Sequence, residues 1–129
     1  MVGVVIVSHS AKIAEGIKEL ALQMAKDHPV FTAGGTQDGG IGTDPMRIQE
    51  AIENADQGDG VAVLADLGSA VMSVDLAKEM IEPELSARVF LANAPIVEGS
   101  IAAVVEASLG SSLDKVLQTA ADAKNMNKE

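Results

Sequence analysis

Four short apolar segments, each followed by a segment with helical spacing, constrain the fold of this chain more than any other feature of its sequence. They cover residues 3–7, 30–33, 61–65 and 87–92 and are rich in β-branched side chains. Continuous runs of this kind are typical of strands buried on both faces of a sheet. Strands that alternate with helices predict a parallel sheet with right-handed crossovers. We therefore expect an α/β fold: a single domain over residues 1–129, whose parallel or mostly parallel sheet has about four strands and helices on both faces.

Capping residues and prolines delimit the predicted helices. Ser10 is a favourable N-cap for a helix over residues 12–26. The spacing of its apolar residues places them on one face: Ile13, Ile17, Leu20, Ala21 and Met24. Asp44 and Pro45 predict the start of a second helix, with Asp44 as cap and Pro45 in the first turn. A third helix is expected to end before Pro83, and three apolar residues give it its spacing: Met72, Leu76 and Met80.

Charge and composition exclude several classes of function. The 129 residues include 9 Lys and Arg against 19 Asp and Glu, for a formal net charge of −10. Such a chain is poorly suited to nucleic acid, whose phosphates are bound by clustered Lys and Arg, but it suits a basic protein partner. The absence of cysteine excludes disulfides, thiolate chemistry and thiolate metal sites. We see neither a membrane-spanning segment nor a secretion signal and expect a cytoplasmic protein that does not bind membranes.

Polar and glycine-rich segments follow all four predicted strands. They are Ser8-His9-Ser10, residues 34–43, Asp66-Leu67-Gly68-Ser69 and Asn93-Ala94-Pro95. Ligands of open parallel sheets bind outside the carboxyl ends of the strands, where these four segments would meet. Helix N-termini beside three of them would add free N–H groups and the positive ends of helix dipoles. This edge is therefore predicted to bind an anion, most obviously a phosphoryl group.

His9 is the predicted nucleophile at this edge, and Asp66 is its predicted partner. A hydrogen bond from Nδ1 of His9 to Asp66 would fix the imidazole tautomer and leave Nε2 free to attack. The other histidine, His28, lies in an Asp-His-Pro turn at the opposite edge and is expected to be structural. One histidine and one carboxylate are too few ligands for a metal site, so we expect neither a metal nor another cofactor.

The segment over residues 34–43, with five glycines in ten positions, has two interpretations. It closes over a ligand or docked partner with its N–H groups near oxygens, or it is only a flexible connection, although its length favours function. It is neither a P-loop nor a dinucleotide fingerprint. The turn from Asp66 to Ser69 likewise either serves the site or only joins a strand to a helix. The candidate phosphate-contacting or partner-contacting residues are Ser8, Ser10, Gly35, Thr36, Gly68 and Ser69.

Three motifs, in this order along the chain, resemble a known family. They are Val-Ile-Val-Ser-His-Ser near the N-terminus, Gly-Gly-Thr-Gln-Asp-Gly-Gly-Ile-Gly-Thr in the middle, and Asp-Leu-Gly-Ser-Ala-Val-Met-Ser after the third strand. Together they resemble the DhaM family, the phosphotransferase subunits of phosphoenolpyruvate-dependent dihydroxyacetone kinases. This family is in turn similar to the IIA domain of mannose-type sugar phosphotransferase systems. The resemblance extends over essentially the whole chain, and Asp-Leu-Gly-Ser-Ala favours the dihydroxyacetone branch.

The resemblance implies that His9 is phosphorylated on Nε2 and that Asp66 steadies its imidazole. It implies that phospho-HPr is the donor and that ADP on a partner kinase subunit, DhaL, is the acceptor. The ATP formed there would phosphorylate dihydroxyacetone on a third subunit. A homodimer is the state that the resemblance implies. Some members carry additional HPr-like and enzyme I-like domains, so we expect this chain to depend on a separate HPr.

Other functions stay open at this point. A IIA domain of a mannose-type sugar phosphotransferase system would pass its phosphoryl group to a IIB domain. A nucleotide-binding module would use the glycine-rich segment for a nucleotide. A hydrolase with Ser8 or Ser10 as nucleophile is less well supported, because the Gly-x-Ser-x-Gly elbow is absent and a neighbouring histidine is poorly placed as its base.

Overall fold

The computed structural model describes all 129 residues and contains one four-stranded parallel sheet. The strands are β1 (Gly3–Ser8), β2 (Val30–Gly34), β3 (Val61–Ala65) and β4 (Val89–Leu91), in the spatial order β2-β1-β3-β4. After β1 the chain adds β2 on one side and then crosses over to add β3 on the other side. The gap beyond the carboxyl ends of β1 and β3 is therefore the topological switch point, where ligands of such sheets bind.

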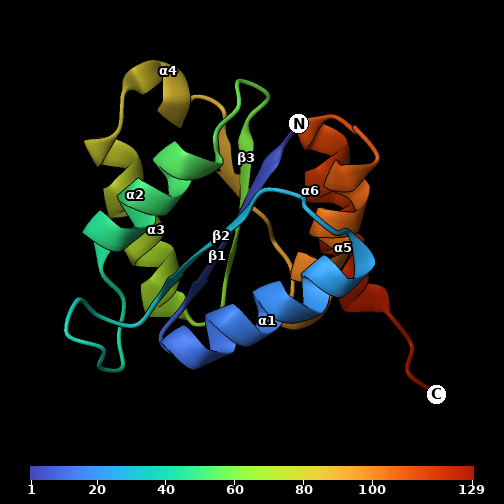
Figure 1. Cartoon of the computed structure of the whole chain (residues 1–129), viewed down its shortest axis with the longest axis horizontal. Coiled ribbons are helices and arrows are strands. Elements are labelled where there is room, and N and C mark those ends of the chain that lie inside the picture. Colours follow the sequence, from blue (N-terminus) through green and yellow to red (C-terminus); the bar gives the residue numbers. More distant parts are fainter.

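Helices cover both faces of the sheet (Figure 1). They are α1 (Ala11–Met24), α2 (Pro45–Ala55), α3 (Gly68–Met80), α4 (Pro83–Ser86), α5 (Ile96–Ser108) and α6 (Leu113–Asp122), followed by the 3-10 turn η1 (Ala123–Asn125). One face is covered by α1, α5 and α6, and the other by α2 and α3. The predicted α/β fold class is confirmed. None of the helices combines the length and the apolar character needed to cross a membrane.

The side chains of β1 divide the core into two layers. Val4 and Ile6 pack against α1, α5 and α6, whereas Val5 and Val7 pack against α2 and α3. All four side chains are fully buried, which explains why the segment is continuously apolar. Burial of each such side chain contributes about 1.5–3 kcal/mol. The strand that precedes His9 is consequently a rigid support.

Local signals start the first two helices where the sequence predicts. The Oγ of Ser10 accepts a hydrogen bond of 3.3 Å from the N–H of Ile13. Oδ1 of Asp44 accepts a hydrogen bond of 2.9 Å from the N–H of Met46, and Pro45 occupies the first turn. Both caps lie at the carboxyl edge of the sheet, so the termini of these helices flank the switch point.

The prediction for the fourth strand is too long, because β4 spans only Val89–Leu91, although the Arg88 carbonyl and the Ala92 N–H also hydrogen-bond to β3. Pro83 ends the third helical segment as predicted, but it also starts α4, since proline is accommodated in a first turn. Arg88 lies in the turn between α4 and β4. Its guanidinium donates hydrogen bonds of 3.0 and 2.6 Å to the two carboxylate oxygens of Asp56. This ion pair links the end of α2 to the turn before β4 at the amino-terminal edge of the sheet, opposite His9.

The large apolar residues that reveal the periodicity of α1 and α3 do not all face the core. On α3 the buried side chains are Ala70, Val74 and Ala77. Its larger apolar residues face solvent, with exposed fractions of 69%, 52% and 42% for Met72, Leu76 and Met80. α1 shows the same division: it buries Ala14, Ile17 and Ala21 and exposes Ile13, Leu20 and Met24. Small side chains let these helices lie close to the sheet, which leaves the large ones outside.

Candidate phosphoryl-transfer site

The strand register brings the two predicted functional residues together. Val7 of β1 pairs with Ala65 of β3, so the residues that follow them leave neighbouring strands at the same level. His9 and Asp66 meet there, with Nδ1 of the imidazole 2.9 Å from Oδ1 of the carboxylate. The predicted hydrogen bond between them is present. Its role in a reaction stays a prediction.

Asp66 accepts hydrogen bonds at both carboxylate oxygens. Oδ2 accepts from the Ser8 hydroxyl at 2.8 Å and from the His9 N–H at 3.0 Å. Oδ1 accepts from the Leu67 N–H at 2.7 Å as well as from the imidazole of His9. Burial raises the pKa of Asp66, but these hydrogen bonds outweigh it and leave the pKa below its usual value. An ionised Asp66 keeps the proton of a neutral His9 on Nδ1 and leaves the lone pair on Nε2.

The Nε2 atom of His9, which we expected to be free, contacts Ser69. The distance from Nε2 to the Ser69 Oγ is 2.5 Å, so the hydroxyl donates to the lone pair of the Nδ1–H tautomer. The side chain of His9 is 20% exposed, at the edge of the sheet. Among the predicted phosphate-contacting residues, Ser69 is the one whose side chain contacts Nε2 of His9. The hydroxyls of Ser8, Ser10 and Thr36 make their contacts with other groups.

Ser8 and Ser10 support the site from behind. The Ser8 hydroxyl is fully buried, donates to Asp66, and accepts a hydrogen bond of 3.1 Å from the Ser10 N–H. The Ser10 hydroxyl caps α1. Neither hydroxyl is directed at Nε2 of His9, so the structure places both in supporting positions and gives no support to direct contact with a phosphoryl group there. It also leaves the hydrolase with Ser8 or Ser10 as nucleophile without support.

The N-terminus of α3 provides free backbone donors beside Ser69. Its N-cap, Leu67, makes no side-chain capping bond, and the N–H groups of Gly68 and Ser69 have no acceptor within the chain. A Cβ at Gly68 would meet no atom within 4 Å, so this terminus is open. Free N–H groups and the positive end of a helix dipole favour an anion. Both residues are therefore placed where an oxygen bound near Nε2 would need donors.

The glycine-rich loop acts as a brace on the backbone around His9. The Gly35 N–H donates to the Ser8 carbonyl at 3.1 Å, and the Gly42 N–H donates to the His9 carbonyl at 2.8 Å. Gly35 has a φ of 73°, and a Cβ there would lie 2.8 Å from the Gly40 carbonyl oxygen, which explains the glycine. The sequence did not predict this bracing role. The N–H groups of Gly35 and Gly42 therefore have acceptors within the chain and are not free to bind a ligand.

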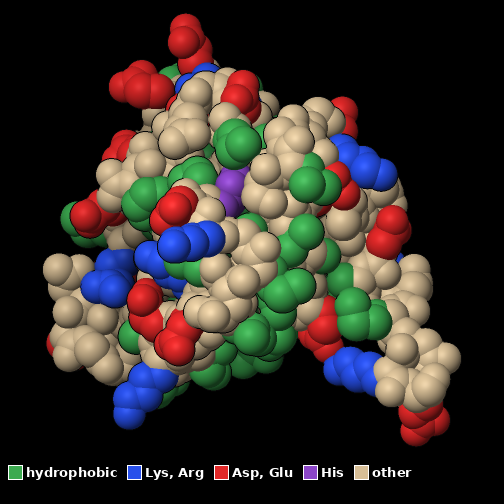
Figure 2. Space-filling view, turned by 45° about the vertical axis from the view of Figure 1, so that its right-hand side comes forward, with side chains coloured by type: hydrophobic (Ala, Val, Ile, Leu, Met, Phe, Trp, Pro, Cys, Tyr) green, Lys and Arg blue, Asp and Glu red, His purple; other side chains and the backbone are tan.

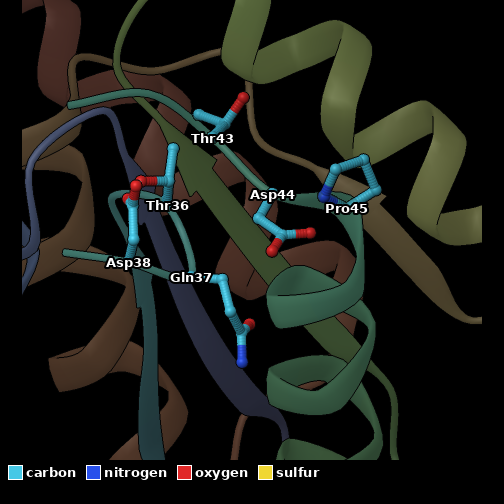
Figure 3. Close-up of a pocket in the computed structure, with 6 residues that line it drawn as sticks. All are labelled: Thr36, Gln37, Asp38, Thr43, Asp44 and Pro45. Atoms are coloured by element: carbon cyan, nitrogen blue, oxygen red, sulfur yellow. The ribbon is translucent and has the colours of Figure 1, made fainter. Parts of the chain in front are cut away.

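Polar side chains surround an open pocket on this loop (Figure 3). It is lined by Thr36, Gln37, Asp38, Thr43, Asp44 and Pro45. The Thr36 hydroxyl donates to Asp38 at 2.5 Å and accepts from the Gly40 N–H at 3.1 Å, so it is engaged within the loop. That same hydroxyl donates a hydrogen bond that holds the pKa of Asp38 below its usual value. Two carboxylates disfavour the phosphates of a nucleotide, so the pocket gives the nucleotide-binding alternative no support.

Two further contacts lie outside the immediate site. The first was not predicted from the sequence, and the second agrees with the expectation for His28. The hydroxyls of Thr43 and Ser73 lie 2.6 Å apart and join the loop to α3; isolated Thr and Ser residues carry no sequence signal for such a contact. His28 is structural, as expected: its Nε2 donates to the Val2 carbonyl at 2.9 Å, and the side chain is buried. Across the chain, no three His, Asp or Glu side chains gather closely enough to hold a metal.

The family model EIIA-man, described as the PTS system fructose IIA component, matches residues 3–117, and the chain belongs to this family. Within it, the chain is similar to the phosphoryl donor subunit DhaM of phosphoenolpyruvate-dependent dihydroxyacetone kinases. The resemblance identified from the three motifs is confirmed.

The individual relatives differ in length. The DhaM subunits of Klebsiella michiganensis and Escherichia coli K12 are each 43% identical over 95% and 100% of this chain, which spans only 27% and 28% of their lengths. A Listeria innocua DhaM, of dihydroxyacetone kinase 2, is 34% identical over 92% of this chain and 95% of its own length. The crystal structure of the unknown-function protein EF1359 superposes with a TM-score of 0.85 at 40% identity, covering 100% of this chain and 98% of that one.

Proposed function

We propose that this chain is a phosphohistidine relay, the phosphoryl donor subunit of a phosphoenolpyruvate-dependent dihydroxyacetone kinase. The observation that carries the proposal is the imidazole of His9, which is held at Nδ1 by Asp66 and directs Nε2 toward the open N-terminus of α3. The similarity to DhaM subunits over nearly the whole chain supports it. Phosphoryl transfer depends mainly on positioning and on charge stabilisation, and these residues can supply both.

In the first transfer, phospho-HPr brings the phosphoryl group. The Ser69 hydroxyl leaves Nε2 of His9, whose lone pair attacks phosphorus while the nitrogen–phosphorus bond of the donor breaks. Nδ1 keeps its proton, and Asp66 balances the positive charge that develops on the imidazole. The N–H groups of Gly68 and Ser69 stabilise the phosphoryl oxygens.

In the second transfer, ADP on a DhaL-type kinase subunit takes the phosphoryl group. A terminal oxygen of ADP attacks phosphorus, the bond from phosphorus to Nε2 of His9 breaks, and ATP and a neutral imidazole result. That ATP phosphorylates dihydroxyacetone on a third subunit. The position of His9 at the sheet edge, 20% exposed, suits a residue that two partners must reach in turn. We expect the relay to work as a homodimer.

Incubation with enzyme I, HPr and phosphoenolpyruvate tests the relay. The chain should acquire an acid-labile phosphate, and His9→Ala should acquire none. His28→Asn is the matched control, because it removes the buried structural histidine and should keep the label. Label on the folded His9→Ala variant would reject the assignment.

A sugar-specific IIA component is a second candidate, which the description of the matching family model favours. It uses the same phosphohistidine but passes the phosphoryl group to a IIB domain. Mixing the phosphorylated chain with each acceptor separates the two functions. Transfer to ADP only when the kinase subunit is present supports the dihydroxyacetone branch, and transfer to a IIB domain alone supports the sugar branch.

The contacts of His9 also have the connectivity of a hydrolase triad. Asp66 contacts Nδ1 of His9, and Nε2 contacts the Ser69 hydroxyl, beside free N–H groups at a helix N-terminus. In this case Ser69 would be the nucleophile. A fluorophosphonate probe decides the matter: labelling of Ser69 that is lost in His9→Ala would favour the hydrolase over the relay.

A further inference from the structure

A contact between two hydroxyl groups joins the glycine-rich loop to α3. The Oγ1 of Thr43 lies 2.6 Å from the Oγ of Ser73, and both side chains are half-buried. In Figure 3 the hydroxyl of Thr43 points toward α3. It is the one hydrogen bond between this loop and α3, so it ties the position of the helix to that of the loop.

The same end of the loop is also bonded to the backbone of His9. The N–H of Gly42, which precedes Thr43 in the chain, donates to the His9 carbonyl at 2.8 Å. Thr43 therefore lies between two contacts. Its neighbour holds the backbone of His9, and its own hydroxyl holds α3.

On α3, the two serines that matter lie one turn apart. Ser69 and Ser73 are separated by four residues, which places them on the same side of the helix. The Oγ of Ser69 is 2.5 Å from Nε2 of His9. The contacts thus close on themselves, and we call the result the contact circuit. It runs through His9, Gly42, Thr43, Ser73 and Ser69, and then returns to His9.

The first turn of α3 lacks one of the usual anchors of a helix start. Its N-cap, Leu67, is held through its N–H but makes no side-chain capping bond. The donors of Gly68 and Ser69 must nevertheless stay aimed at one point beside Nε2 of His9. Displacing such a group by about 1 Å is enough to slow a reaction about 100-fold. A fixed point one turn into the helix, at Ser73, supplies the missing support.

We infer that Thr43 and Ser73 are positioning residues of the phosphoryl-transfer site, whose hydroxyl contact holds Ser69 and the first turn of α3 against Nε2 of His9. The inference rests on the proposed relay function. No hydrogen bond joins either hydroxyl to the imidazole, so both residues act through Ser69 and the N–H groups beside it. A phosphoryl group on Nε2 then meets donors that are already in place.

Two hydroxyls remote from the site provide matched controls. The Oγ1 of Thr119 donates to Glu106 at 2.9 Å, and the Oγ of Ser111 donates to the other carboxylate oxygen at 2.5 Å. Both side chains are half-buried, as those of Thr43 and Ser73 are. They lie with α5 and α6 on the right of Figure 1, the side that Figure 2 brings forward, whereas the glycine-rich loop lies on the left.

The first test compares Thr43→Val and Ser73→Ala with the controls Thr119→Val and Ser111→Ala. Phospho-HPr is the probe, and the rate of phosphorylation is measured in a single turnover at saturating phospho-HPr, on variants shown by circular dichroism to be folded. Thr43→Val and Ser73→Ala should each lower this rate about threefold to tenfold, and the controls should change it less than about twofold. The double variant should lose no more than either single one, because both changes break one contact.

Two further measurements separate positioning from a general structural role. Thr43→Ser keeps the hydroxyl and should transfer within about twofold of the unaltered rate. In ¹⁵N spectra of the unphosphorylated chain, Thr43→Val should move the Nε2 resonance of His9 in the same direction as Ser69→Ala does, because the contact with Ser69 is weakened. The Nδ1 resonance should stay in place, since Asp66 still holds that nitrogen.

Several results would overturn the inference. One is a rate for Thr43→Val or Ser73→Ala that equals those of the controls. Others are losses that multiply in the double variant, no recovery in Thr43→Ser, or an Nε2 resonance that does not move. If the unaltered chain takes no phosphate from HPr, the proposed function itself fails. The ¹⁵N measurement needs no phosphate and would still decide whether the pair positions Ser69.

Discussion

Replacing Asp66 by asparagine tests how His9 is held, because the change removes the negative charge and keeps the shape. The carboxylate accepts from the Ser8 hydroxyl and the His9 N–H at one oxygen, and from the His9 imidazole and the Leu67 N–H at the other. Asparagine has a single acceptor oxygen. Whichever way its amide turns, its NH2 group faces one backbone N–H that loses its acceptor, either that of His9 or that of Leu67.

The magnitude follows from these contacts. A part-buried N–H without an acceptor costs about 1–3 kcal/mol, and hydrogen bonds to a neutral amide are weaker than those to a carboxylate by about 1 kcal/mol. We therefore expect Asp66→Asn to lower the free energy of unfolding by about 2–4 kcal/mol at neutral pH. One of the two amide orientations also moves the imidazole proton to Nε2, the wrong tautomer for attack. Transfer should fall by about 10²–10⁴-fold, by analogy with the aspartate of a serine protease triad.

The loss of stability should depend on pH in a stated direction. Because the pKa of Asp66 is lowered in the folded chain, ionised Asp66 contributes stability above its ordinary pKa of about 4. That contribution is lost as the pH falls through the lowered folded pKa. The difference in unfolding free energy between the unaltered chain and Asp66→Asn should therefore shrink in acid, as urea titrations across the acid range would measure.

Three measurements check Asp66→Asn: urea unfolding, the rate of phosphorylation by phospho-HPr, and the ¹⁵N chemical shifts of the His9 imidazole, which report the tautomer. Asp114→Asn on α6 is the control, because it removes an exposed carboxylate without these contacts. It should leave the transfer rate and the tautomer unchanged and lower the unfolding free energy by less than about 1 kcal/mol, the contribution of a carboxylate in the first turn of a helix. A transfer rate within about twofold of the unaltered chain, with the proton still on Nδ1, would refute the role of Asp66.

Three further substitutions have defined outcomes. Ser69→Ala should slow phosphoryl transfer about tenfold, because a donor beside Nε2 is lost, and should change the unfolding free energy by less than about 1 kcal/mol; an unchanged rate would contradict its role. His28→Asn should remove a loss of stability that begins as the pH falls below about 6.5: burial lowers the pKa of His28, and its buried Nδ1 has no acceptor for the added proton. Equal pH dependence in both proteins would contradict this. Gly35→Ala should cost about 1–3 kcal/mol in unfolding free energy, because its Cβ meets a carbonyl oxygen, whereas Gly39→Ala, which also has a positive φ but open space, should cost less. Equal losses in urea titrations would show that the close contact is not the cause.

Much of the fold was predictable because local patterns and burial agree. β1 reads as a strand because its residues are buried on both faces, which leaves no polar position between Gly3 and Val7. Ser10 and Asp44 fix helix starts through contacts within a few residues, and such contacts are visible in sequence. The start of the fourth strand was placed too early because Ala87 and Arg88 belong to the turn after α4, where Arg88 pairs with the distant Asp56.

The sequence by itself determined the alternation of strands and helices, and thereby that His9 and Asp66 lie at the carboxyl edge of one sheet. Periodicity, caps and the direction of parallel strands suffice for that, since each acts over a few residues. Only the tertiary structure decided that the Ser69 hydroxyl contacts Nε2 and that the N–H groups of Gly35 and Gly42 hold the backbone around His9. These contacts join segments far apart in the chain, and they depend on strand register and helix placement. For the same reason the structure alone shows which side of α3 faces solvent: its small side chains face the sheet, and its large apolar ones are left exposed.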